Sequence, residues 1–251
     1  MSTRRVAALV VTAMPEEAQP FLESLALVDK AEPLSLLGTA QAWSLELPAR
    51  AEGADHTREL ILVHSGIGLV SAASALATVL SQVTPDVVVS AGTTGGLGRE
   101  VEVGDVCVSQ TLAYGDVDAT AFGYAIGQTP GQPTVFRGDP VLVERAGAAQ
   151  EALGQATPAS VSARIHVAQM LAGGSFVTAA NVKDMRERFP RAISTDMEST
   201  ALAQVCHAAG IPFVSIRGVS DLCGPEAGQD FHIGADEAAT RSTAVVLAAL
   251  R

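Results

Sequence analysis

Hydrophobic residues occur along this chain in short continuous runs that alternate with stretches of helical periodicity. Apolar runs of about four to eight residues, bounded by turn residues, are typical of strands buried on both faces of a parallel sheet. The predicted strands cover residues 6–13, 60–65, 86–90, 106–109, 165–171, 192–195 and 213–219. A weaker hairpin is expected over residues 34–47.

The helical stretches lie between these runs. They cover residues 66–83, 141–153, 182–189, 199–209 and 235–250, and a further helix begins at Pro15. Proline is tolerated in a first helical turn, whereas Pro20 is expected to kink the same helix. Gly210 is a typical helix stop. Residues 51–57 form a polar loop, and residues 116–133, rich in Gly and aromatics, form a long loop of the kind that is usually functional.

The alternation of strands and helices predicts an α/β fold. We expect three αβα layers, with a twisted, mixed and mostly parallel central sheet flanked by helices. No internal repeat, low-complexity tract or linker divides the chain, so residues 1–251 are predicted to form a single domain.

Composition narrows the classes of partner. Hydrophobic residues make up 48% of the 251, charged residues 17%, and the net charge is −11. Disorder is therefore not expected, and neither nucleic acid nor an anionic membrane surface suits so acidic a chain. The three scattered cysteines predict a reducing, cytoplasmic setting. The five histidines lack metal-ligand spacing, so no metal site is predicted.

The N-terminus superficially resembles a signal peptide, because Arg4 and Arg5 precede the apolar residues 6–11. That run is short and has no suitable small-residue cleavage site, so a buried first strand explains it better. No run approaches the ~18 apolar residues that a membrane span requires.

The candidate catalytic residues lie at the ends of predicted strands. Ser220 and Asp221 follow a strand and precede the break at Gly224 and Pro225. Polar residues just past the carboxyl end of a strand lie where ligands bind in α/β sheets. Leu222 and Cys223 should partly desolvate Asp221, which favours its protonated form and suits it to donate a proton. The alternative is that Asp221 merely caps the next turn.

Three other strand ends carry similar side chains: Met14 and Glu17, the turn 93–95, and residues 196–198. Any one of them can be a cap, but four at the same edge of one sheet indicate a site. Carboxylates converging beside small Gly and Thr turns suit glycosidic chemistry. One acid protonates the leaving group, another activates water, and the oxocarbenium-like state is stabilised electrostatically.

One segment partly matches the glycine pattern of a dinucleotide-binding site. Gly66 and Gly68 lie between a strand and a helix, but Ser71 stands where a third glycine is needed. The next strand ends without an acid for a ribose hydroxyl. We therefore expect these glycines to permit a tight turn whose N–H groups can line the same crevice.

Seven motifs spread over nearly the whole chain are jointly specific. They are TAMPEE at residues 12–17, HSGIG at 64–68, GTTGG at 92–96, VGDV at 103–106, DVDATAFGY at 116–124, DME at 196–198 and RGVSD at 217–221. Together they resemble the 5′-methylthioadenosine/S-adenosylhomocysteine nucleosidases, within the purine nucleoside phosphorylase superfamily. The resemblance implies a nucleoside phosphorylase-like fold.

The resemblance also implies roles for individual residues. Asp221, oriented by Ser220, would protonate purine N7, and Glu17 would position and activate the attacking water. Glu198 would hold the ribose hydroxyls, with Arg217 supporting the ribose and water side of the pocket. The implied substrate-binding residues are Met14, Ile67, Thr93, Thr94, Gly95, Phe176, Val177, Asp196, Met197, Glu198, Arg217, Phe231, Phe122 and Pro130.

Within that set, Phe176 would stack on adenine, the Val177 backbone would read its edge, and Met197 would pack against the sugar. Ile67 and Phe231 would line the slot for the 5′-thio substituent. A second subunit would complete this slot with Phe122 and Pro130, which implies a homodimer.

Several positions depart from the family pattern. Asp196 replaces the usual Glu, and Thr93 and Thr94 replace the usual Ser and Ala. Pro15 stands where an acid is usual, and the residues after Asp221 also differ. These departures leave the reaction type intact and affect the preference for the base and the 5′ group.

The prediction is a hydrolase of methylthioadenosine and adenosylhomocysteine, acting without a cofactor in nucleoside catabolism and methionine salvage. One alternative is a relative that acts on futalosine or 6-amino-6-deoxyfutalosine. Another is a phosphorylase, which needs an anion pocket that Glu17 would disfavour. A non-catalytic nucleoside-binding protein is disfavoured because Glu17, Glu198 and Asp221 are all retained.

Overall fold

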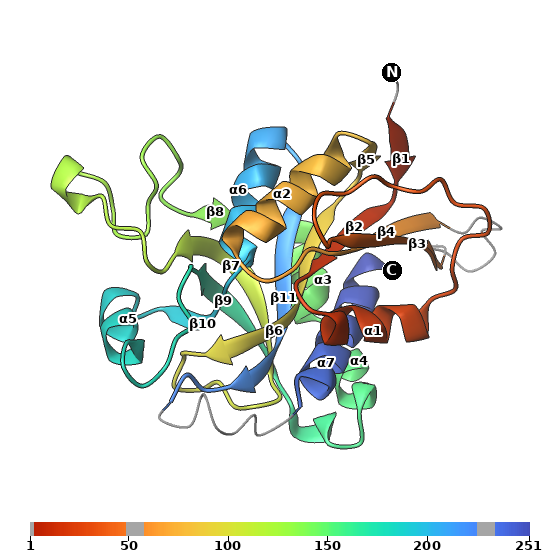
Figure 1. Ribbon diagram of the computed structural model, residues 1–251. Coiled ribbons are helices and arrows are strands. Elements are labelled where there is room, and N and C mark those ends of the chain that lie inside the picture. The colour runs from red at the N-terminus through yellow and green to blue at the C-terminus, as the bar shows by residue number, and fades with distance from the viewer. Residues whose placement is uncertain (1–2, 49–57, 225–233) are drawn as a thin grey trace.

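The computed structural model describes residues 3–48, 58–224 and 234–251, so the predictions for residues 51–57 and for Phe231 lie outside the described residues. A nine-stranded sheet forms its centre, in the order β10-β9-β7-β11-β6-β2-β4-β3 with β8 paired to β7 (Figure 1). Its strands are β2 (Ala8–Thr12), β3 (Gln41–Leu47), β4 (Arg58–His64), β6 (Val88–Gly96), β7 (Val106–Tyr114), β8 (Phe136–Arg137), β9 (Ile165–Ala172), β10 (Ala192–Asp196) and β11 (Phe213–Asp221). β1 (Arg4–Val6) and β5 (Val83–Pro85) form a separate parallel pair.

The sheet is mixed and mostly parallel, as the sequence predicts. β6 runs parallel to both β2 and β11, and β9 runs parallel to both β7 and β10. β11 is antiparallel to β7, and β3 is antiparallel to β4. β10 also pairs with β6, which links β10, β9, β7, β11 and β6 into a closed ring of neighbours. The ends of several strands thereby meet in one place.

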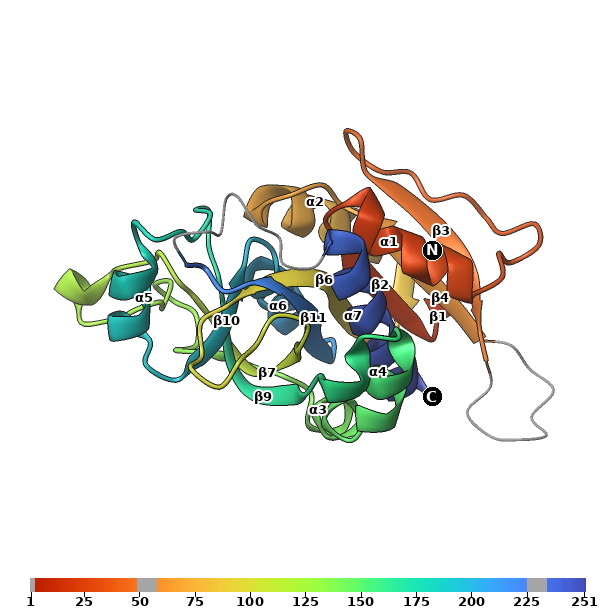
Figure 2. The same ribbon diagram turned by 90° about the horizontal axis from the view of Figure 1, so that it is seen from below.

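Helices cover both faces of the sheet, which confirms the three-layer prediction (Figures 1 and 2). The helices are α1 (Pro15–Ser24), α2 (Leu69–Leu80), α3 (Pro140–Gly147), α4 (Gln150–Ala156), α5 (Val182–Arg188), α6 (Ser199–Ala209) and α7 (Ala235–Leu250). α2 and α6 pack together on one face, and α1, α3 and α4 gather around α7 on the other. In the described part of the chain, no helix is long and apolar enough to cross a membrane.

Burial on both faces explains the continuous apolar runs. In β2, Val10 packs into the core on the α7 side, whereas Leu9 and Val11 pack into the core on the α2 and α6 side. Because neighbouring residues of a strand point to opposite faces, a strand covered on both sides needs apolar residues throughout. Each such side chain contributes about 1.5–3 kcal/mol on full burial.

Several predicted elements differ from the observed ones. The hairpin over residues 34–47 is wrong, because only Gln41–Leu47 is a strand and its partner is β4. The predicted helix 141–153 is divided into α3 and α4, with the first ending at Gly147, and glycine is a poor helix former. The predicted helix 66–83 ends at Leu80, and its last residue begins β5.

The GTTGG segment is the most consequential difference. The sequence predicts a turn over residues 92–96, but β6 continues as a strand through Gly96. Pairing on both sides overrides the weak strand propensity of glycine, since Gly95 faces Asp221 of β11 and Thr195 of β10. The segment is therefore a strand paired on both sides and not a turn.

Candidate active site

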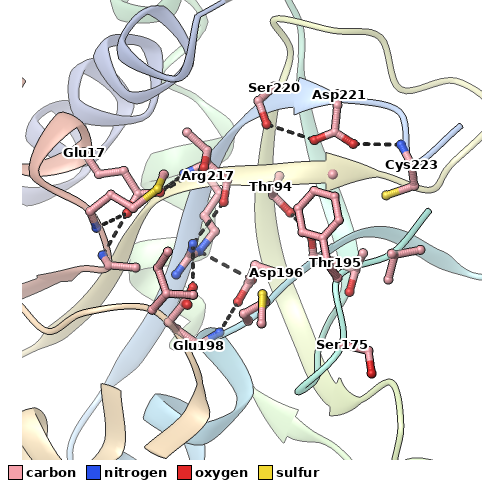
Figure 3. Close-up of a pocket in the computed structure, with 18 residues that line it drawn as sticks. Glu17, Thr94, Ser175, Thr195, Asp196, Glu198, Arg217, Ser220, Asp221 and Cys223 are labelled. Atoms are coloured by element: carbon pink, nitrogen blue, oxygen red, sulfur yellow. Dashed lines mark hydrogen bonds and ion pairs between the residues drawn. The ribbon is translucent and has the colours of Figure 1, made fainter. Parts of the chain in front are cut away.

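A hollow of about 730 Å³, including its open mouth, lies where β2, β6, β10 and β11 end (Figure 3). It is lined by Ala13, Met14, Glu17, Ile67, Thr93, Thr94, Gly95, Ser175, Phe176, Val177, Thr195, Asp196, Met197, Glu198, Arg217, Ser220, Asp221 and Cys223. Six segments distant in sequence therefore meet here.

Glu17 is held by four hydrogen bonds at one end of this pocket. The N–H groups of Ala13 and Met14 donate to Oε2 at 2.8 and 3.1 Å. The N–H and the hydroxyl of Thr93 donate to Oε1 at 2.7 and 2.9 Å. A carboxylate accepts about four hydrogen bonds, so the orientation of this buried side chain is fixed.

Gly92 makes room for that carboxylate. A Cβ atom added at this position would overlap the Glu17 carboxyl group. The backbone at Gly92 also has a φ of +135°, which L-residues rarely adopt. Glycine is thus required here by close approach as well as by conformation.

Arg217 is a fully buried cation beside Glu17. Its Nη1 donates to the Thr93 carbonyl at 3.0 Å and lies 3.2 Å from Oε2 of Glu198. Its other two nitrogens donate to the hydroxyls of Ser90 and Ser199. All three guanidinium nitrogens therefore already have protein partners.

Asp196 and Glu198 complete this charged end. Oδ1 of Asp196 accepts the N–H groups of Glu198 and Ser199, at 2.8 and 2.7 Å, and so holds the start of α6. Oε1 of Glu198 accepts the N–H of Gly68 at 2.8 Å. The sequence prediction for Gly66 and Gly68 is confirmed to this extent: both have positive φ, and an N–H of their turn lines the crevice.

Burial raises the pKa of Glu198 to about 7. Arg217 opposes that rise, Asp196 adds to it, the Gly68 N–H lowers it, and Glu17 raises it. Three buried carboxylates around one guanidinium leave an excess of negative charge, which disfavours ionisation of the last of them.

Asp221 lies at the other end of the pocket, where β11 carries a bulge. The pairing of β11 with β6 shifts between Val219 and Asp221, and bulges next to active sites re-aim side chains. Ser220 Oγ donates to Oδ2 of Asp221 at 3.1 Å, and the Cys223 N–H donates to Oδ1 at 2.9 Å. Asp221 therefore caps the following turn and also lines the pocket, so the two sequence interpretations are compatible.

Cys223 is a lining residue that the sequence analysis did not identify. Its backbone has a φ of 53°, and burial, followed by the nearby Asp221, raises the pKa of its thiol to about 12. Ala13, Ser175 and Thr195 were also missed. Each of the four lies within two residues of a predicted site residue, so adjacency to the motifs is the signal that could have found them.

The remaining predicted residues divide by location. Ile67 and Phe176 line the pocket and are exposed, whereas Val177 is buried. Phe122 is 83% exposed in the loop that projects from the body of the molecule, and Pro130 of the same loop is also exposed (Figure 1). Among the residues that the structure describes, Phe122 and Pro130 do not line this pocket.

The two ends of the pocket are joined by a short stretch of β6. Thr93 contacts Glu17, and Gly95 pairs with Asp221. Two residues of a strand span about 7 Å. The arrangement places a fixed carboxylate and an ionic network at one end of the pocket and a separate carboxyl group at the other.

Comparisons with known proteins agree on one group. The sequence model of the Phosphorylase superfamily matches residues 7–251. A 5′-methylthioadenosine/S-adenosylhomocysteine nucleosidase from Chromohalobacter salexigens is 38% identical over 197 residues, covering 78% of this chain and 81% of that protein. A protein of the same name from Staphylococcus saprophyticus is 37% identical, with 78% and 82% covered.

Solved structures give the same result. The nucleosidase from Neisseria meningitidis, in complex with methylthio-immucillin-A, has a TM-score of 0.82 and 32% identity, and each chain is 97% covered. The nucleosidase from Colwellia psychrerythraea, in complex with adenine, also has a TM-score of 0.82 and 32% identity, covering 100% of this chain and 96% of that one.

Proposed function

The chain belongs to the 5′-methylthioadenosine/S-adenosylhomocysteine nucleosidase family of the phosphorylase superfamily, and we propose that it hydrolyses the N-glycosidic bond of methylthioadenosine and adenosylhomocysteine. The products are adenine and the corresponding 5′-thioribose. The observation that carries this proposal is the convergence of Glu17, Glu198 and Asp221 on one pocket.

The geometry of the pocket supports a separate role for each of the three acids. Asp221, held by Ser220, protonates the purine as the bond to the sugar breaks. Glu17 orients the attacking water and accepts its proton as the new C–O bond forms, and Glu198 accepts hydrogen bonds from the ribose hydroxyls. The oxocarbenium-like sugar then lies beside an end of the pocket where carboxylates outnumber guanidinium groups, which stabilises its positive charge.

The hydrogen bonds that Arg217 already makes within the protein favour hydrolysis over phosphorolysis. A phosphorylase needs cations whose N–H groups are free to bind phosphate. Among the described lining residues, Arg217 is the cation, and its three nitrogens are already engaged by Thr93, Ser90, Ser199 and Glu198. Glu17 adds negative charge where a phosphate nucleophile would have to approach.

A substrate panel tests the proposal directly. Methylthioadenosine, adenosylhomocysteine, 5′-deoxyadenosine, inosine and futalosine are incubated with the protein in phosphate-free buffer, and the free base is quantified. We expect adenine from the two thionucleosides without added phosphate. A strict phosphate requirement would favour a phosphorylase, and release from futalosine alone would favour the other nucleosidase.

A homodimer belongs to the same proposal. Phe122 is an exposed aromatic residue in a loop that projects from the body of the molecule (Figure 1), and Ile67 and Phe176 are exposed lining residues of the pocket. Phe122 and Pro130 of one subunit would complete the 5′ slot of its partner. The Phe122→Ala variant should then raise KM for methylthioadenosine and weaken the dimer in analytical ultracentrifugation. Leu37→Ala, at a 66% exposed residue elsewhere, serves as the control.

The wider setting also stays a proposal. Three free, buried cysteines suit a reducing cytoplasm, and release of adenine and a thioribose suits methionine salvage. We propose one domain spanning residues 1–251, with no cofactor required. Full activity after dialysis against a chelator is the expected result, and lost activity that metal restores would contradict it.

A further inference from the structure

Three serines lie next to one another across the middle of the sheet. Ser90 of β6 is paired in register with Ser215 of β11, and the Ser215 N–H donates to the Ser109 hydroxyl of β7 at 2.8 Å. All three are fully buried in strands that are otherwise largely apolar. Because a buried hydroxyl is costly unless it is hydrogen-bonded, a row of them requires an explanation.

A fourth serine joins the row from the helix above it. Ser199 is the first residue of α6, and its Oγ lies 3.1 Å from Oγ of Ser90 and 2.8 Å from Oγ of Ser215. Asp196 fixes the position of Ser199 by accepting its N–H. The small side chains allow the first turn of α6 to approach the sheet beside Arg217.

The hydroxyls receive the protons of a buried guanidinium. Arg217 Nε donates to Ser199 at 3.0 Å, and Nη2 donates to Ser90 at 2.8 Å. The single N–H of Nε is donated to Ser199. Oδ2 of Asp196 lies 3.4 Å from the Nε atom and has no hydrogen-bond partner among the described residues. The plane of the guanidinium is therefore set by the two serines more than by this carboxylate.

We propose that Ser90 and Ser199, tied to each other and to Ser215, are positioning residues that fix Arg217 for the reaction. The inference rests on the proposed function and deepens it. With Nε and Nη2 held by the serines, Nη1 faces both the Thr93 carbonyl and Glu198.

Arg217 therefore connects Glu17 and Glu198 at this end of the pocket. Thr93, whose carbonyl Arg217 binds, holds Glu17 through its own N–H and hydroxyl. A small rotation of the guanidinium would displace both the group that orients water and the group that holds the ribose. Displacements of about 1 Å in such groups can cost roughly 100-fold in rate.

The test compares alanine variants inside and outside the cluster. Ser90→Ala leaves Nη2 without its acceptor, and kcat/KM should fall about 10- to 100-fold. Ser199→Ala should cost about 3- to 10-fold, because Nε can turn to the nearby Asp196. Ser194→Ala is the matched control, since Ser194 is equally buried on β10 but lies outside the cluster. Its kcat/KM should stay within about twofold.

A pH profile separates positioning from general destabilisation. Arg217 opposes the rise in the pKa of Glu198, while Asp196 and Glu17, which also face Glu198, add to it. If Arg217 is held less firmly, the pKa of Glu198 rises further. The acid limb of kcat/KM should then move to higher pH in Ser90→Ala and not in Ser194→Ala. Ser90→Cys, whose slightly larger thiol is a weaker acceptor than the hydroxyl, should lie between Ser90→Ala and wild type, and it also serves if Ser90→Ala does not fold.

The outcomes are distinct. Loss of kcat/KM with a shifted acid limb in the Ser90 and Ser199 variants supports the inference. An active wild type whose folded Ser90 and Ser199 variants match it, or a Ser194→Ala variant with the same loss and shift, overturns it. A wild type that releases no adenine overturns the proposed function and this inference with it.

Discussion

Both ends of the pocket carry carboxyl groups, but the two ends differ in how many hydrogen bonds and ion pairs hold these groups. At one end Glu17, Asp196 and Glu198 surround Arg217, and Glu17 alone accepts four hydrogen bonds. At the other end Asp221 accepts two hydrogen bonds, from the Ser220 hydroxyl and the Cys223 N–H (Figure 3).

This difference indicates which carboxyl group protonates the leaving base. A carboxylate held by several fixed N–H and O–H donors keeps one position, as a preorganised charge beside a sugar cation and a bound water must. A carboxyl group with fewer fixed donors can give a proton to a ligand. The charged end therefore stabilises the sugar cation and activates water through Glu17, while Asp221 donates a proton to the leaving base.

The largest predicted effect comes from removing the acid at the Asp221 end. Asp221→Asn should lower kcat about 1,000-fold or more, because an amide cannot donate a proton in the transition state. Adenine binding, measured by calorimetry, should change much less. A variant with wild-type kcat would remove the distinction between the two ends.

The second effect concerns Glu17. Glu17→Gln should lower kcat about 100- to 1,000-fold, because the amide nitrogen would face donors that need an acceptor. Glu16→Gln, at the exposed neighbouring position, is the control and should leave kcat unchanged. Weaker substrate binding with an unchanged kcat would contradict the role assigned to Glu17.

Glu198→Gln should reduce kcat/KM by about 10- to 100-fold, since a charged acceptor for ribose hydroxyls is lost. Its stability tests the electrostatics of the same end. The folded protein holds a proton on Glu198 up to about pH 7, against an ordinary pKa of 4.5. The contribution of this protonation to the free energy of unfolding is fully present below pH 4.5, and it is lost as the pH rises through about 7.

Denaturation of Glu198→Gln at two pH values measures that loss. Between pH 5 and pH 8 the free energy of unfolding of the variant should rise relative to wild type, by up to about 3 kcal/mol. If the free energy of unfolding of the two proteins changed equally with pH, burial would not raise the pKa of Glu198.

The smallest of these effects should come from Gly92. Gly92→Ala adds a Cβ that overlaps the Glu17 carboxyl group, so kcat should fall about tenfold as Glu17 is displaced. Gly38→Ala is the control, because its φ of +64° also disfavours an L-residue but no atom lies within 4 Å of the added Cβ. Equal kcat values for the two variants would show that the approach of Gly92 to Glu17 is unimportant.

Local patterns in the sequence predicted much of this molecule. The bounds of α6 and α7 match the predictions, and Gly210 ends α6 in the left-handed conformation. The motif residues at four strand ends do meet at one pocket. These features depend on periodicity and on short motifs, which a single sequence contains.

Features that depend on pairing between distant segments were not predicted. β6 extends through Gly95 only because β10 and β11 pair with it, and the bulge before Asp221 depends on that same register. The contact of Ser90 with Ser199 joins residues that are 109 positions apart. No local propensity distinguishes such a serine from one at the surface.

The most direct test of the central claim follows the oxygen of water. The enzyme is given methylthioadenosine in ¹⁸O-labelled water containing phosphate, and the products of a single turnover are analysed by mass spectrometry. We expect unlabelled adenine and a thioribose that carries one ¹⁸O atom at C1, because the carboxylate end of the pocket admits water and not phosphate. A sugar 1-phosphate, or a sugar without the label, would contradict the account.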